Sequence, residues 1–361
     1  MTDQGVSSPT VLKIAAQQFS AFFWCIGAGA LAAFLNVPAG WLCGSLGMSA
    51  FLSLTGRSAL MLPPLRDFAM VLSGLSIGLS VTPETVARFA TIPLSLTIMM
   101  VAVVMITTSS AFILVRFYGW PRLDACLASA PGALSTILII ANDKQADLTK
   151  IVIIQLFRLF MLMAVLPSVV TAGYGHHAAQ HLAHPLWLSA DGLALVCASG
   201  LVLAVVFDRL QFPAPILLGS MFAAGWMNGS GLVAGQMPTL LSSLSFAMVG
   251  WFIGERFRGV RARDLRTLIG PICMSFLSTI LVALFFSELV VLLLNFPQAE
   301  ALVAFAPGGV EAMSILALAL GLDSVFVASH HIVRFVFIGL ALPMIIRFKP
   351  HWLEGAESNK M

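Results

Sequence analysis

Charged side chains are scarce in this sequence of 361 residues. Asp, Glu, Lys and Arg make up only 10% of it, whereas apolar residues make up 59%. Soluble domains carry about 25% charged residues, so this composition excludes a soluble fold and fits a chain that has lipid as its solvent. The formal net charge of +3 is too small to indicate a polyanionic partner, so we expect no nucleic acid partner.

Motifs of soluble enzymes are also missing. The sequence has no GxxxxGK[ST] loop for ATP, no CxxC pair, no haem or iron–sulfur spacing and no nucleophile elbow. We therefore expect no catalytic residue, no metal and no cofactor. The cysteines are odd in number and lie in apolar stretches, which favours buried free thiols over disulfides. They are Cys25, Cys43, Cys126, Cys197 and Cys273.

Long apolar runs fill most of the chain. Most of them are long enough to cross a hydrocarbon core about 30 Å thick, so we predict an all-α polytopic membrane protein. The predicted segments lie near 14–35, 39–56, 67–82, 91–115, 123–142, 149–172, 189–207, 214–233, 239–254, 267–294, 298–320 and 323–346.

The second half of the sequence repeats the first. Ala130-Pro131-Gly132 recurs 176 residues later as Ala306-Pro307-Gly308, and around the second apolar segment the offset is 175. This steady register indicates an internal duplication. Matched single residues include Gly74 and Gly250, Pro121 and Pro297, Asp147 and Asp323, Arg158 and Arg334, and Pro167 and Pro343. We predict a first transmembrane repeat over 1–172, an extracytoplasmic histidine-containing linker over 173–188, a second repeat over 189–346 and a cytoplasmic tail over 347–361.

Basic residues indicate how the two halves are oriented. If all the segments cross, the Lys and Arg of loops divide evenly between the two sides. If 123–142 and 298–320 instead enter and return, nearly all lie on one side and Arg88 alone lies on the other, as the positive-inside rule requires. We therefore predict inverted repeats of five crossings plus one re-entrant segment each, with both termini cytoplasmic, in a bacterial inner membrane. A broken helix that crosses at each Pro-Gly remains the alternative.

The Ala-Pro-Gly sequences mark the predicted substrate site. Proline and glycine break helices, so Gly132 and Gly308 are predicted to begin half-helices whose positive N-termini meet and attract an anion. A proline kink that serves packing alone is the alternative. The predicted substrate-binding residues are Pro131, Gly132, Ser135, Thr136, Arg158, Pro307, Gly308, Gly309, Glu311, Ser314, His331 and Arg334.

Two arginines lie deep inside apolar segments, where an unpaired charge costs about 3 kcal/mol or more. Arg158 and Arg334 are predicted to face the half-helix tips and hold a carboxylate or phosphate. The alternative is a structural pair, either Arg334 with Glu311 or Arg158 with a backbone carbonyl. His331 shares a helix face with Arg334, which allows a proton-linked role or a satisfied core histidine.

Other polar residues have simpler interpretations. Asp147 and Asp323 open helices and are predicted to be N-caps, with ion coordination as the alternative. The arginine-rich stretch 256–266 follows a spanning segment, so we expect it to contact anionic lipid. A solvated linker is favoured over a metal site for His176, His177, His181 and His184.

The stretches APGALSTILIIAND, at 130–143, and APGGVEAMSILALALGLDSVFVASHHIVRF, at 306–335, resemble the AbrB duplication family of bacterial integral membrane proteins. The resemblance covers about 14–346. The second stretch, with Gly309 and Glu311, is closer to the family pattern than the first, which has Ala133 and Ser135. Members of the family carry the labels AbrB-like regulator and ammonia monooxygenase, so the resemblance implies a regulatory or oxygenase role beside the one favoured by the residues.

Three functions follow from these observations. The leading hypothesis is a secondary transporter of a small organic anion, coupled to an ion and partnered by the lipid bilayer. The second is a membrane-bound regulator or sensor of gene expression that signals through the loop at 255–266. The third is a membrane monooxygenase that uses the histidine linker. The sequence leaves oligomerisation open.

Overall fold

The computed structural model describes residues 11–57, 60–81, 92–132, 134–174 and 187–348. Within these ranges the chain is helical, apart from an isolated bridge between Trp187 and Gln236, so the predicted all-α class is confirmed. The helices of the first half are α1 Val11–Phe34, α2 Gly40–Leu54, α3 Pro63–Gly78, α5 Ile92–Tyr118, α6 Arg122–Ser129, α7 Leu134–Asp143 and α8 Leu148–Tyr174. Those of the second half are α9 Ala190–Arg209, α10 Pro215–Gly229, α11 Thr239–Gly254, the short η2 Glu255–Phe257, α12 Ala262–Leu294, α13 Gln298–Phe305, α14 Val310–Ala319 and α15 Ser324–Phe348.

Among the described residues, five helices are long and apolar enough to cross a membrane, namely α5, α8, α9, α12 and α15. Helices α2, α3, α10 and α11 have only 15 or 16 residues. Each is therefore about 22–24 Å long, which is less than the hydrocarbon thickness of about 30 Å. The five long helices fit a membrane protein.

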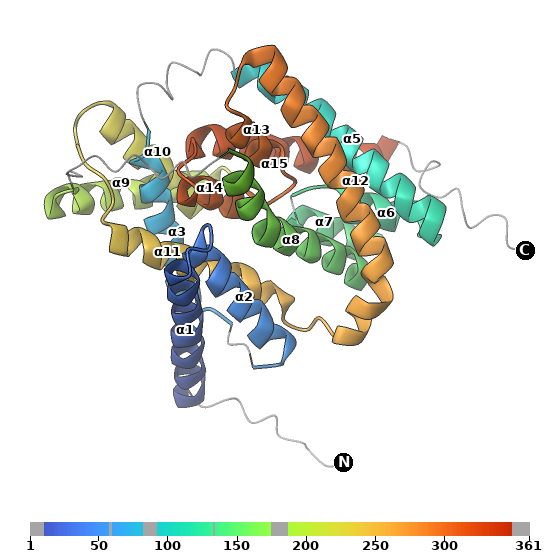
Figure 1. Cartoon of the computed structure of the whole chain (residues 1–361), viewed down its shortest axis with the longest axis horizontal. Helices are drawn as coiled ribbons and strands as arrows, with labels where there is room; N and C mark the ends of the chain where they lie inside the picture. Colours follow the sequence, from blue (N-terminus) through green and yellow to red (C-terminus); the bar gives the residue numbers. More distant parts are fainter. Residues whose placement is uncertain (1–10, 58–59, 82–91, 133, 175–186, 349–361) are drawn as a thin grey trace, which may run out of the picture.

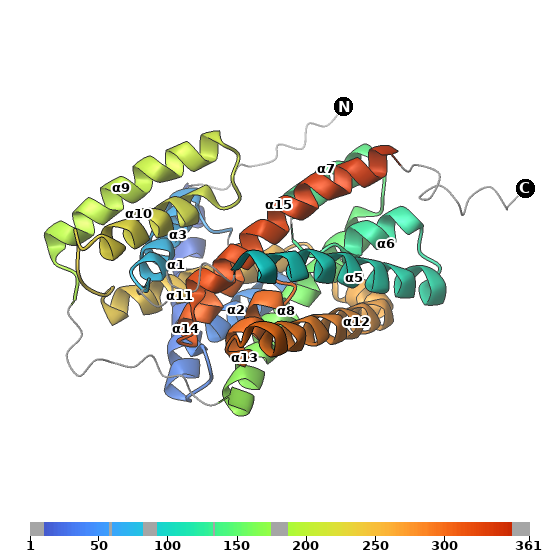
Figure 2. The same cartoon turned by 90° about the horizontal axis from the view of Figure 1, so that it is seen from above.

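The helices pack as two groups (Figures 1 and 2). The scaffold group contains α1, α2, α3, α9, α10 and α11, and the hairpin group contains α5 to α8 and α12 to α15. Glycines let scaffold helices touch, because a Cβ at Gly74 would lie 2.3 Å from the carbonyl oxygen of Leu217, and one at Gly250 would lie 2.4 Å from that of Leu42. A larger residue would push α3 from α10 and α11 from α2.

Helices at matching places in the two halves run antiparallel. The start of α3 lies beside the end of α11, where the Glu255 carboxylate accepts a hydrogen bond of 2.6 Å from the Met61 N–H. At the opposite ends of these helices, the Ser76 and Ser242 hydroxyls are 3.3 Å apart. The long helices α5 and α12 also run antiparallel and are joined through serine hydroxyls.

Each pair of half-helices is a hairpin that returns to the end from which it started. In the first half, Trp120 precedes α6, and the Lys150 ammonium, in the first turn of α8, lies 5.5 Å from the centre of its ring. In the second half, Phe296 precedes α13 and stacks on Phe326 of α15, with ring centroids 4.5 Å apart. Both hairpins thus place their Ala-Pro-Gly breaks at the tip, inside the protein.

All five cysteines are free. Cys25 and Cys126 are buried, as predicted. Cys273 is exposed on α12, so the prediction of a buried thiol is wrong there. The reason is that α12 presents much of its apolar surface outward, with only 28% of its candidate membrane span buried.

Candidate functional site

Both Ala-Pro-Gly sequences interrupt a helix. The alanine before each proline is extended, with ψ of 121° at Ala130 and 134° at Ala306, because a following proline ring disfavours the helical conformation. The half-helices α7 and α14 begin two residues after the glycines that were predicted to start them. The predicted breaks are therefore confirmed, with that small shift in position.

The two break glycines are needed for different reasons. Gly132 has a φ of +97°, a conformation that L-residues with a side chain rarely adopt. At Gly308 the constraint is space, because a Cβ there would lie 2.5 Å from the Cγ of Met313. The sequence motif is shared, but the conformations of its two copies differ.

Each buried arginine binds the carbonyl groups at the end of the first half-helix. Arg158 donates to the carbonyl oxygens of Ser129 and Ala130, at 3.1 Å and 3.2 Å. Arg334 donates to that of Ala306 at 2.7 Å and also to that of Gly308. The last carbonyls of a helix lack helical partners and carry partial negative charge, so a guanidinium stabilises them.

One turn before each arginine, a second side chain binds the same half-helix. Gln155 donates to the carbonyl oxygen of Leu127 at 2.9 Å, and His331 lies 3.2 Å from that of Val303. The other ring nitrogen of His331, Nδ1, bonds to Arg334. A carbonyl only accepts and a guanidinium only donates, so His331 is neutral, with its proton on Nε2.

These contacts resolve the alternatives left open for the arginines. Glu311 pairs with Arg256 at 3.2 Å, so the predicted structural pair between Arg334 and Glu311 is wrong. The carbonyl alternative for Arg158 is the one observed, and it holds for Arg334 as well. Because each guanidinium has five N–H donors, these bonds leave further donors for other partners.

A cavity of about 360 Å³ lies where the two hairpin tips meet. We call it the anion cavity, because Arg158, Arg256 and Arg334 line it together with one carboxylate, that of Glu311. The N-terminus of α14 also opens into it through Gly309, and the first amides of a helix carry partial positive charge. The described lining therefore has a net positive charge, which favours a bound anion.

Most of the predicted site residues meet in this cavity. Those that line it are Gly132, Arg158, Pro307, Gly308, Gly309, Glu311, His331 and Arg334. Pro131, Thr136 and Ser314 do not line it, and Ser314 is instead fully buried within α14 without a hydrogen-bond partner. The side chain of Ser135 lies outside the described residues.

Sequence reasoning missed three contributors to the cavity. Gln155 was matched to His331 by register but was not proposed for the site. Arg256 was assigned to lipid contact, whereas it reaches Glu311. The loop 211–214 before α10 carried no chemical signal, although its proline repeats that of the loop before α2.

The helix-opening aspartates are N-caps, as predicted. Asp147 accepts from the Lys150 N–H at 3.1 Å, and Asp323 accepts from the Val325 and Phe326 N–H groups at 3.1 Å and 3.0 Å. Burial alone would raise the pKa of the Asp147 carboxyl, but the N–H and ammonium of Lys150 hold that pKa below its usual value. The four linker histidines lie outside the described residues.

An all-helical fold with five long apolar helices and two internal hairpins fits the class of multi-pass α-helical membrane proteins. The chain belongs to the AbrB family, whose model, described as "Transition state regulatory protein AbrB", matches residues 57–349.

Two relatives are similar over nearly their whole length. The "Uncharacterized protein YhjN" of Bacillus subtilis (strain 168) is 24% identical over 374 residues, which cover 93% of this chain and 95% of that one. The "Putative regulator AbrB" of Escherichia coli (strain K12) is 24% identical over 322 residues, which cover 87% of this chain and 91% of that one.

Proposed function

We propose that this protein is a secondary transporter of a small organic anion that binds in the anion cavity, driven by a coupling-ion gradient or by exchange. The observation that carries the proposal is the charge of the lining, where three guanidiniums face one carboxylate. Buried cations are costly in a membrane protein and commonly mark a substrate or ion path.

The dimensions and walls of the cavity favour a particular kind of anion. A volume of about 360 Å³ is at the small end of ligand pockets. Leu156, Phe212 and Phe335 supply apolar walls beside the arginines. This combination suits a carboxylate or phosphate group carried on a short hydrocarbon body.

The inverted-repeat arrangement belongs to the same proposal. Helices α6 and α13 have 8 residues each, and α7 and α14 have 10 each, with starts 176 residues apart (122 and 298, 134 and 310). The antiparallel course of α3 and α11 supports a relation by a two-fold axis in the membrane plane. We assign 1–172 and 189–346 to the two repeats, joined by an extracytoplasmic linker at 173–188.

In this arrangement ten helices cross and the two hairpins are re-entrant. The contacts between Trp120 and Lys150 and between Phe296 and Phe326 support re-entry, because each hairpin starts and ends at one side. The distribution of Lys and Arg then places both termini, including the tail at 347–361, in the cytoplasm of a bacterium with the protein in its inner membrane.

Flux through liposomes tests the transporter proposal. Purified protein is reconstituted with an internal pool of a small dicarboxylate, and uptake of the radiolabelled compound is followed with and without an ion gradient. We expect uptake by the wild type and none by Arg334→Gln. A panel of carboxylates and phosphates that all fail to move, although the protein is folded, would contradict transport.

A membrane-bound regulator is the second candidate function. The family description and the printed name of the Escherichia coli relative favour it. Arg256 connects the anion cavity to the arginine-rich loop that follows α11, so an anion that displaces Glu311 from Arg256 would alter that loop. A partner protein that binds the loop only when an anion is present, with no flux in liposomes, would favour this function over transport.

A further inference from the structure

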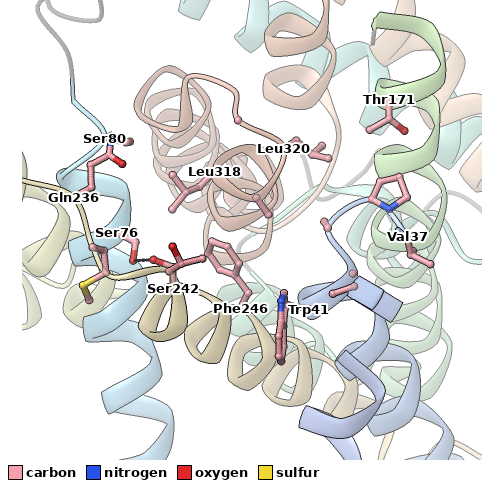
Figure 3. Close-up of a pocket in the computed structure, with 18 of the residues that line it drawn as sticks. Val37, Trp41, Ser76, Ser80, Thr171, Gln236, Ser242, Phe246, Leu318 and Leu320 are labelled. Carbon is pink, nitrogen blue, oxygen red and sulfur yellow. Dashed lines mark hydrogen bonds between the residues drawn. The ribbon is translucent and has the colours of Figure 1, made fainter. Parts of the chain in front are cut away.

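A second cavity, of about 550 Å³, lies at the other end of α14 (Figure 3). Its walls come from α3 and α11, from α8, from the start of α2 and from the end of α14, which contributes Leu318 and Leu320. The described side chains that line it are apolar, aromatic or hydroxyl- and amide-bearing, and none is charged. Trp41, Phe246 and Ser242 are typical of this wall. We call it the uncharged cavity.

The two cavities are lined by equivalent loops. Asn36 and Gln211, which are 175 residues apart, have φ of 56° and 58°, and Ala39 and Ala214 have φ of 51° and 46°. The loop 36–39 before α2 lines the uncharged cavity, whereas the loop 211–214 before α10 lines the anion cavity. The same structural element therefore appears once in each cavity, as it would on opposite faces of an inverted repeat.

Helix α14 connects the two cavities. Gly309 and Glu311, at its start, line the anion cavity, and Leu318 and Ala319, at its end, line the uncharged cavity. A helix of ten residues is about 15 Å long. Both cavities are also bounded by both groups of helices, so they lie along one seam, at which α14 packs on α3 and α11.

One polar side chain in the middle of α14 has no partner. Ser314 is 0% exposed, and its hydroxyl makes no hydrogen bond. Burial of an unsatisfied hydroxyl costs about 1–3 kcal/mol, and such groups in native proteins call for an explanation. A state in which water or a polar solute passes along α14 would satisfy this hydroxyl.

The neighbouring residues indicate that the cavities open toward opposite sides. Arg256, which begins the arginine-rich stretch, lines the anion cavity, so this cavity faces the cytoplasm under the positive-inside rule. Trp187, which directly follows the predicted extracytoplasmic linker, lines the uncharged cavity.

We propose that the uncharged cavity is the extracytoplasmic end of the path whose cytoplasmic end is the anion cavity, and that the path follows α14 past Ser314. This inference rests on the proposed transport function and adds its route. The structure is then the cytoplasm-open state, in which the segment of the seam around Ser314 is closed.

Paired cysteine variants test the sides to which the cavities open. Val37 and Phe212 are equivalent residues, each lines a different cavity, and they are 41% and 39% exposed. A membrane-impermeant maleimide should label Val37→Cys in right-side-out vesicles and Phe212→Cys in inverted vesicles. Peptide mass spectrometry locates each adduct, so the native cysteines are kept. Labelling of both variants from the same side would overturn the proposal.

A second pair of variants tests the route. Ser314→Cys should react with a small methanethiosulfonate reagent at least about tenfold faster than Ser275→Cys, a serine that is also buried but lies between α5 and α12. Equal, slow reaction of both would overturn the route. Neither test uses an anion, so failure of anion binding would count against the proposed function alone, and wrong sidedness would count against the route.

Discussion

The two hairpin tips have the same support but different charges at the cavity. In each, an arginine binds the carbonyls that end the first half-helix, and a residue one turn earlier binds a carbonyl further back. The second tip adds Glu311, which pairs with Arg256, whereas Gly132 and Leu134 are the described contribution of the first tip's break. The comparison separates a shared structural role of the arginines from a charge arrangement that only the second copy provides.

Loss of an arginine should show the largest effect, and it should be unequal between the tips. Arg334 binds two carbonyls and His331, whereas Arg158 binds two carbonyls. We expect Arg334→Gln to lower the free energy of unfolding by about 3 kcal/mol or more, because buried partners lose charged hydrogen bonds. Thermal unfolding in detergent measures this change, and Arg158→Gln should cost less. A larger loss for Arg158→Gln would contradict the comparison.

Exchange of the residues one turn earlier should be milder. Gln155 shows that glutamine serves this position in the first half, so His331→Gln should change stability by less than about 1 kcal/mol. His331→Leu should cost about 1–3 kcal/mol, because the Val303 carbonyl and an Arg334 N–H lose their partner. Thermal unfolding of both variants distinguishes a polar partner from a spacer. Equal effects of Gln and Leu would argue against the observed hydrogen bonds.

The break glycines should respond differently to a change in their surroundings. Gly132→Ala and Gly308→Ala should each cost about 1 kcal/mol or more, the first through its positive φ and the second through contact with Met313. In double-mutant cycles of thermal stability, Met313→Ala should couple to Gly308→Ala but not to Gly132→Ala. Coupling to both would show that the two constraints are the same.

The charge pair of the second tip should tune anion affinity in opposite directions. Glu311→Gln removes the cavity's described carboxylate and should tighten binding, whereas Arg256→Gln should weaken it. Because both side chains are partly exposed, each effect should be within about fivefold, or about 1 kcal/mol. Titration of the anion in a thermal-shift assay measures it. Changes in the same direction would indicate that the pair acts through structure.

The smallest expected effect is a pH dependence at Glu255, just beyond α11. Burial raises the pKa of this carboxyl, against the lowering effects of the Met61 N–H and the nearby arginines. Its folded pKa lies above its unfolded pKa, so its contribution to stability is complete below the unfolded pKa and is lost as pH rises through the folded pKa. Glu255→Gln should therefore gain stability relative to the wild type between about pH 4 and 7. A constant difference in melting temperature would contradict this.

The sequence predicted those parts of the site that depend on local chemistry. Proline and glycine in an apolar run predict a helix break, and an arginine in such a run predicts a buried polar contact, so Pro307, Gly308 and Arg334 could be assigned in advance. The internal repeat made each of these assignments stronger.

The remaining parts depend on tertiary packing that has no local signal. Backbone carbonyls are present at every residue, so the partners of Arg158 could not be chosen from sequence. Arg256 lies in a stretch typical of lipid contact, and its contact with Glu311 requires α11 to end beside the start of α14. Ser314 was predicted to line the site because of its spacing from Gly308, but the helix turns it into the protein interior.

A thermal-shift screen of the purified wild type and Arg334→Gln against small carboxylates and phosphates tests anion binding most directly. We predict that at least one organic anion raises the melting temperature of the wild type and leaves that of the variant unchanged. Arg158→Gln, assayed in parallel, shows whether both tips are needed. Absence of stabilisation by any anion, or equal stabilisation of wild type and Arg334→Gln, would contradict an anion site between the hairpin tips.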